Sequence, residues 1–159
     1  MATESPLLHD GSQCVVNFDA RNSSVTGTTL AGPSGSAQFL AVMLGTTADR
    51  TLIQTSSGSS GQLAYGILQN KPSTGIAADV GIFGITKAIA QTTTITAGSE
   101  VMTSGSSMTG RLTLYSTTVG PGTARLGRAL ENVTTAGQVF TMALYGFGMG
   151  GGTIAATTA

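Results

Sequence analysis

The chain has 159 residues and a formal net charge of zero at neutral pH, because seven Lys or Arg residues balance seven Asp or Glu residues. Charged residues make up 9% of the chain, against about 25% in an ordinary soluble domain. The basic residues are scattered along the sequence, which argues against nucleic-acid binding, because such proteins gather Lys and Arg on one face.

The length is that of one domain with tails. Ser, Thr and Gly must form most of its surface, and a surface of this kind without net charge favours association with neighbouring molecules. Residues 1–11 lack a basic segment followed by an apolar core, and no apolar run approaches the ~20 residues that span a bilayer. We therefore expect a soluble protein made in the cytoplasm, without membrane association. The single Cys14 permits no internal disulfide.

Residues 1–11 form a polar arm with one apolar group, Pro6, Leu7 and Leu8. The next segment, QCVVNF at residues 13–18, is apolar enough for a strand, and the Ser/Thr/Gly-rich residues 20–36 that follow are typical of a loop. Two arrangements are open for the arm and this strand. They pair within the domain, or they reach out and add to the sheet edge of another chain.

The rest of the chain alternates short apolar runs with turn-forming segments. We expect strands at residues 13–18, 37–44, 50–55, 63–69, 80–89, around 101, 111–115, 125–130 and 138–147, with weaker extended segments at 25–30 and 92–95.

The central stretch, residues 63–90, predicts a long hairpin whose turn lies at residues 70–75. Along its second strand the apolar residues fall on both faces, Val80 and Ile82 on one and Phe83, Ile85 and Ile89 on the other. Both faces must therefore be at least partly covered. Gly84 in the middle of the strand indicates a bulge or bend, so we expect a strongly bent sheet.

The later strands predict which side chains face the core. Leu112 and Leu114 are expected on the inner face of their strand, and Phe140, Met142 and Leu144 on one side of the last strand. A short helical turn at residues 125–132 is the one helical alternative, and Gly127 weighs against it. Many short strands about 8–12 residues apart are typical of an all-β sandwich or barrel.

No arrangement of polar residues indicates catalysis. The glycines at 146, 148 and 151 spell GxGxxG, but only eight residues follow, too few for the helix of a dinucleotide-binding unit. His9 beside Asp10 lies in the arm, without the rigid scaffold that a catalytic triad needs. The carboxylates are spread out and suggest no metal ligands. We expect no enzyme and no cofactor.

The chain has three tyrosines, a residue type that lines sugar-binding faces: Tyr65, Tyr115 and Tyr145. Each lies in an apolar strand, which is more typical of core or interface tyrosines.

Four pieces of the chain resemble the head decoration, or capsid cement, proteins of tailed bacteriophages. They are QFLAV at residues 38–42, AYGILQNKP at 64–72 with Gly75 closing the turn, the strand at 80–87 with its internal Gly84, and LGRALE at 126–131 followed by Ala136-Gly137 and the last strand. The tract YGILQNKP is the most specific of them. The resemblance covers about 110 residues and omits the arm and the glycine-rich tail.

The resemblance implies one small β-barrel or β-tulip domain, at residues 36–147. The composition of the flanking segments predicts an extended arm and irregular segment at 1–35 and a flexible tail at 148–159. It also implies a structural protein of the virion that binds the outer surface of the expanded capsid. There it would bridge subunits of the major capsid protein and gather as homotrimers.

For the capsid contact we select five apolar residues of the arm and first strand: Leu7, Leu8, Val15, Val16 and Phe18. They would act by adding a strand to a sheet edge or by packing into a groove. The alternative function is a carbohydrate- or receptor-binding module of a virion appendage. A fibre would show self-similarity at a fixed period, and the sequence shows none.

Overall fold

The computed structural model describes residues 14–19, 38–44, 52–55, 64–72, 77–103, 110–116 and 125–145. These residues form strands and their connections, without a helix. The strands are β1 (Cys14–Asp19), β2 (Ala41–Leu44), β3 (Leu52–Gln54), β4 (Gly66–Leu68), β5 (Ala77–Ile89), β6 (Glu100–Thr103), β7 (Leu112–Leu114), β8 (Arg125–Ala129) and β9 (Val139–Leu144). The predicted all-β class is confirmed, and residues 125–129 form a strand rather than a helical turn.

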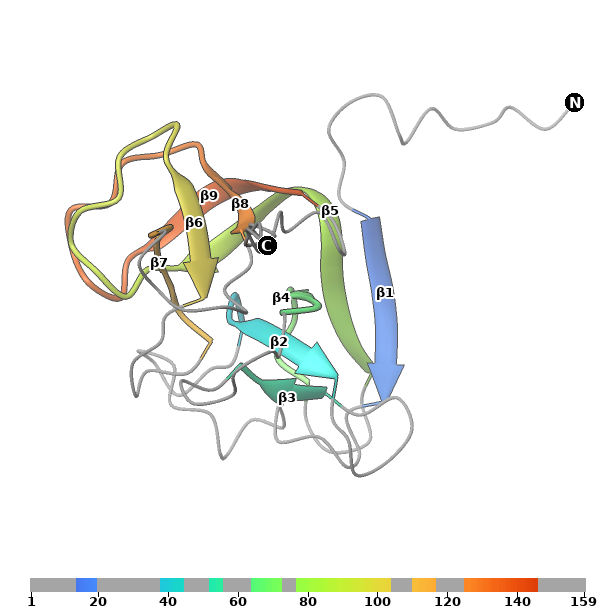
Figure 1. The fold of residues 1–159 in the computed structure, drawn as a ribbon. Coiled ribbons are helices and arrows are strands. Elements are labelled where there is room, and N and C mark those ends of the chain that lie inside the picture. The colour runs from blue at the N-terminus through green and yellow to red at the C-terminus, as the bar shows by residue number, and fades with distance from the viewer. Residues whose placement is uncertain are drawn as a thin grey trace, which may run out of the picture.

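All strand pairs are antiparallel, in the order β3-β2-β4-β5-β9-β8-β6-β7, with β1 pairing to β5 off this path (Figure 1). The two ends of this sheet meet just before β7. The Ala41 N–H donates to the Gly110 carbonyl at 2.7 Å, and the Gly110 N–H donates to the Thr55 carbonyl at 3.0 Å. The sheet is therefore a nearly closed barrel, as the resemblance implied.

The hairpin of β4 and β5 is held by its connector. Ile67 and Leu68 of β4 lie opposite Gly81 and Val80 of β5. Just beyond β4, the Asn70 side chain donates to the Ala77 carbonyl and accepts a hydrogen bond from the Asp79 N–H. This is the local bonding that makes Asn common in turns, and it explains why the QNKP tract follows an apolar strand here.

β5 is the strand that bends. Its first part pairs with β1 on one edge and β4 on the other, while Gly84 to Ile89 pair with Leu144 to Val139 of β9. Gly84, at the change of partner, has a φ of 99°, which residues with a side chain rarely adopt. The register with β1 also slips here, since Cys14 lies opposite Phe83 and Val15 opposite Gly81. The predicted bend is confirmed.

A turn replaces the predicted start of the strand at residues 37–44. Gln38 and Phe39 form a turn, and Phe39 has a φ of 69°. The Phe39 N–H donates to the Leu68 carbonyl at 2.7 Å, and its carbonyl accepts from the Ile89 N–H at 3.2 Å. These two bonds compensate for the unfavourable backbone conformation, and β2 begins only at Ala41.

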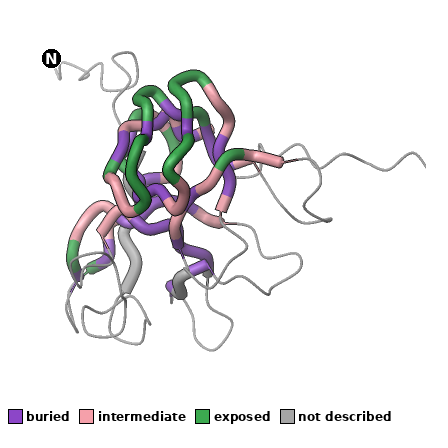
Figure 2. The backbone as a smooth tube through the Cα atoms, turned by 90° about the vertical axis from the view of Figure 1, so that its left-hand side faces the viewer, coloured by how far each residue is buried: buried purple, intermediate pink, exposed green. Residues whose placement is uncertain are grey.

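Two apolar clusters lie on opposite faces of β2 and β4. The first fills the barrel and includes Ala41, Ile67, Val101, Leu112, Phe140 and Met142. The second contains Leu40, Val42, Leu52, Leu68, Ala78, Val80 and Ile89. Because neighbouring residues of one strand point to opposite faces, Ile67 and Leu68 enter different clusters. Figure 2 shows the buried segments gathered at the centre of the molecule.

The predictions for the later strands are confirmed in part. Phe140, Met142 and Leu144 of β9 are buried, as expected. Leu112 is buried too, but Leu114 is 37% exposed, so the prediction of two inner leucines was wrong for the one at the end of β7. Residues 92–95 form no strand, and only an isolated bridge joins Ile95 to Val133.

Two glycines make close backbone approaches that yield a stability prediction. A methyl group at Gly66 would meet the Gly81 carbonyl and the Val80 side chain, and one at Gly127 would meet the Ala143 carbonyl and the Met142 side chain. We expect Gly66→Ala and Gly127→Ala each to lower the free energy of unfolding by about 1–3 kcal/mol or more, as overpacking does. Denaturant unfolding measures this.

Gly98→Ala is the matched control. No atom lies within 4 Å of the added methyl, but the φ of 87° disfavours alanine, so we expect a loss of about 1 kcal/mol. Equal losses at all three positions would show that packing at Gly66 and Gly127 is not the constraint.

Candidate interaction surfaces

The first strand pairs within its own domain. Val15, Val16 and Phe18 lie in β1, opposite Gly81, Val80 and Ala78 of β5. The strand is therefore part of the barrel, the first of the two arrangements left open by the sequence. Of the five predicted contact residues, the structure therefore places three in one strand, β1. Leu7 and Leu8 lie outside the described residues.

β1 presents one backbone edge to β5, and β5 is its only partner among the strands that the structure describes. An edge strand has a row of N–H and C=O groups that can pair with a strand of another chain. The segment CVVNFD contains no Lys or Pro, the residues that commonly block such pairing. Strand addition at this edge is thus compatible with the fold.

A second surface lies on the outside of the barrel over β5, β9 and β8, and we call it the outer face. Ile85, Ala143 and Arg128 are directly opposite one another across the three strands, and Lys87 lies opposite Thr141. Opposite residues in antiparallel strands share a face. Of the exposed large apolar side chains among the described residues, four lie on or beside this face: Phe83, Ile85, Leu130 and Val139. The sequence predicted that both faces of this strand are at least partly covered, and Phe83 and Ile85 are about half exposed, at 54% and 49%.

A carboxylate is fixed at the border of the outer face. Glu131 Oε1 accepts a hydrogen bond from the Thr141 hydroxyl at 2.7 Å, and Oε2 accepts one from the Thr141 N–H at 3.2 Å. These two bonds, with a smaller contribution from the Lys87 charge, lower the pKa of Glu131 below its ordinary value. Glu131 is thereby kept ionised next to the exposed apolar side chains.

A third group of polar residues ties β6, β7 and β8 together. Arg125 Nη1 lies 3.2 Å from Glu100 Oε2, and its guanidinium carbon lies 4.6 Å from the centre of the Tyr115 ring. The hydrogen bond with Tyr115 and the Glu100 charge raise the pKa of Arg125. Since an arginine is ionised in any case, the effect of this group is to hold three strand ends together.

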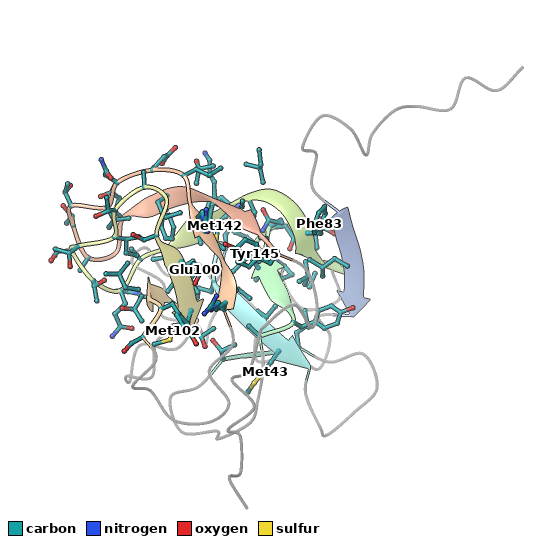
Figure 3. The ribbon with its side chains drawn as sticks, turned by 45° about the horizontal axis from the view of Figure 1, so that its top comes forward. Met43, Phe83, Glu100, Met102, Met142 and Tyr145 are labelled. Carbon is teal, nitrogen blue, oxygen red and sulfur yellow. The ribbon has the colours of Figure 1, made fainter. Side chains whose placement is uncertain are left out.

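The tyrosines contribute to packing in two of three cases. Tyr115 lies against Arg125, and Tyr65 packs against the second apolar cluster. Tyr145 is half-buried just after β9 and is labelled in Figure 3.

The described part of the chain contains no group of three or more His, Cys, Asp or Glu residues placed to hold a metal ion. It also contains no helix of the length and hydropathy needed to cross a membrane. His9, Asp10 and the glycines of the GxGxxG match lie outside the described residues.

No protein-family model and no curated protein matches this sequence. Solved structures do match its fold. The N base of head fiber gp8.5 of bacteriophage phi29 superposes with a TM-score of 0.53 and 16% identity, over 82% of this chain and 94% of that one. A chain of the capsid of Myoviridae phage XM1 superposes with a TM-score of 0.55 and 18% identity, over 84% and 83%. The chain therefore shares its fold with the base of a phage head fiber and with a chain of a phage capsid, and this agrees with the fold that the resemblance implied.

The Glu131 contacts give a prediction about pH. Because the folded pKa is lowered, the stabilisation is present above the ordinary Glu pKa of about 4.3 and is lost as pH falls through the folded pKa. Thr141→Val removes the hydroxyl donor but keeps the backbone N–H, so we expect the Glu131 pKa to rise part of the way to its ordinary value. Carboxyl NMR titration measures it, and an unchanged pKa would contradict the assignment.

Proposed function

We propose that this chain is a structural protein of a bacteriophage virion. It binds the outer surface of the expanded capsid, bridges subunits of the major capsid protein and carries out no catalysis. On the shell it gathers as homotrimers, and like other virion components it is made in the host cytoplasm. No nucleic acid, membrane or cofactor takes part.

The single observation that carries this proposal is the shared fold. Two phage head proteins each superpose on more than four fifths of this chain, so all three share one arrangement of strands. Fold alone does not fix function, but the low charge of the chain points the same way. A surface with 9% charged residues suits many close contacts with identical neighbours better than it suits selective binding of an ionic ligand.

We assign the capsid contact to Leu7 and Leu8 of the arm and to Val15, Val16 and Phe18 of β1. The edge of β1 that has no partner among the described strands supports this assignment, because a strand of a capsid subunit can pair there without disturbing the bonds to β5. The apolar arm residues would then pack beside the added strand. DNA inside the shell pushes its subunits apart, and contact area buried across two subunits opposes their separation.

Co-sedimentation with shells of the parent phage tests the proposal. Purified full-length chain is mixed with expanded, undecorated shells and with unexpanded procapsids. We expect saturable binding to the expanded shell alone, with a stoichiometry that gives the number of copies at each site. Absence of binding to either shell would refute the proposed function.

The arm assignment makes a narrower prediction. We expect the double variant Leu7→Ser, Leu8→Ser to bind expanded shells at least about tenfold more weakly, since burial of a Leu side chain contributes about 1.5–3 kcal/mol. Leu114→Ser is the control, because Leu114 is an exposed leucine on β7, away from β1. Equal binding by the double variant and the control would rule out the arm, but not shell binding itself.

The low charge of the chain also predicts how shell binding responds to salt. Contacts made by apolar side chains and backbone pairing are screened little by added ions. We expect the dissociation constant from expanded shells to change by less than about threefold between 0.05 and 0.5 M NaCl. A change of tenfold or more would show that ion pairs dominate the contact.

A module of a virion appendage that binds carbohydrate or a receptor is the second candidate. The observation in its favour is the match to the base of a head fiber. Copy number in purified virions separates the two functions, because a capsid-covering protein is present in hundreds of copies and an appendage in few.

A further inference from the structure

The outer face gathers most of the exposed apolar side chains of the described chain. Phe83 and Ile85 of β5 are 54% and 49% exposed, Val139 of β9 is 41% exposed, and Leu130, just after β8, is 45% exposed. Leu114 of β7 is the one other large apolar side chain in the described residues with comparable exposure. Together the four expose on the order of 300 Å², the size of patch that often marks an interaction site.

The outer face also carries positive charge. Lys87 follows Ile85 by two residues on β5, and Arg128 of β8 lies in one row with Ile85 and Ala143. Both cations are exposed. Two carboxylates lie beside these cations, and each already has a partner. Glu131 is engaged by Thr141, and Glu100, which lies opposite Arg128 on β6, is paired with Arg125. An occupant with apolar and acidic side chains therefore fits this surface.

The chain itself has such a segment, and it joins the barrel at this point. β1 begins at Cys14, directly opposite Phe83, so residue 13 precedes the strand beside the outer face. Residues 1–13, MATESPLLHDGSQ, hold the apolar group Pro6, Leu7 and Leu8 together with Glu4 and Asp10, and no Lys or Arg.

Length and area favour this segment over a separate molecule. Thirteen extended residues reach about 45 Å, while β5 from Phe83 to its end at Ile89 spans about 20 Å. A patch of about 300 Å² is well below the ~800 Å² per partner of a stable interface between free proteins. A tethered segment needs much less, because its effective concentration is about millimolar.

We propose that in the free protein residues 1–13 lie across the outer face of the same molecule. Leu7 and Leu8 contact its exposed apolar side chains, and Glu4 and Asp10 lie near Lys87 and Arg128. The arrangement does not depend on the proposed function. If both hold, the arm must leave the face before it reaches a shell, so weakening the docked state with Ile85→Ser should tighten shell binding.

Disulfide trapping tests the docking on the full chain without shells. In a Cys14→Ala background, Leu8→Cys is combined with Ile85→Cys or with Val139→Cys, two exposed positions of the outer face, and mildly oxidised with glutathione disulfide. The control pairs Leu8→Cys with Leu114→Cys, which is on β7, separated from β5 by three strands of the sheet. We expect a disulfide within the monomer to form at least tenfold faster in one of the two outer-face pairs than in the control.

Charge reversal on the face adds a second comparison. Lys87→Glu with Arg128→Glu should slow trapping severalfold, whereas Lys71→Glu, at an exposed lysine before β5, should leave the rate unchanged. Equal rates in the outer-face and control pairs would overturn the proposal. Disulfide-linked dimers without monomeric product would overturn it as well, because the arm would then belong to a neighbouring copy.

A second measurement is needed because an introduced cysteine pair could itself perturb the arm. Binding of an apolar fluorescent dye reports exposed apolar surface and needs no introduced cysteines. If Leu7 and Leu8 cover the outer face, the variant Leu7→Ser, Leu8→Ser uncovers it, and binding of an apolar fluorescent dye should rise at least twofold. If the arm stands free, the same variant removes two exposed leucines and dye binding falls or stays the same, which contradicts the proposal.

Discussion

The bend of β5 is the constraint on which the rest of the barrel depends. A straight strand of thirteen residues would extend about 43 Å and would leave one of its ends without partners. Because the direction changes at Gly84, the first part lies between β1 and β4, and the second part pairs with β9. The same bend brings the Ile89 N–H to the carbonyl of Phe39, so the far end of β5 is bonded back to the turn just before β2.

The bend also decides what the outside of the barrel offers to partners. Phe83 and Ile85 follow the alternation of β5, in which residues 78, 80, 86 and 88 are buried and residues 77, 83, 85 and 87 are exposed. Phe83 lies at the change of partner, opposite Cys14 at the start of β1 (Figure 3), and Ile85 follows it by two residues on the same face. The feature that closes the fold thus brings an exposed apolar surface and the segment before β1 to one place.

The parts of the fold that rest on side-chain alternation could be predicted from the sequence, and the parts that rest on backbone bonds could not. Strand β9 and the bend at Gly84 follow from apolar spacing and a glycine within a strand. Phe39 carries no sign of its left-handed backbone, because residues of its kind rarely adopt it. The closure through Gly110 joins backbone groups 55 residues and more apart, and no side chain marks it.

Net neutrality gives a misleading picture of this chain's electrostatics. Two of its seven acidic residues, and none of its seven basic ones, fall within residues 1–13, before β1. The barrel that follows therefore has an excess of cations, two of them exposed on the outer face. Opposite charges on the arm and on the barrel attract within one molecule and leave little net field at a distance, so neighbouring copies repel one another weakly. A protein that crowds onto a shell in many copies, as we propose for this chain, benefits from both effects, because its apolar arm is also kept from aggregating before it arrives there.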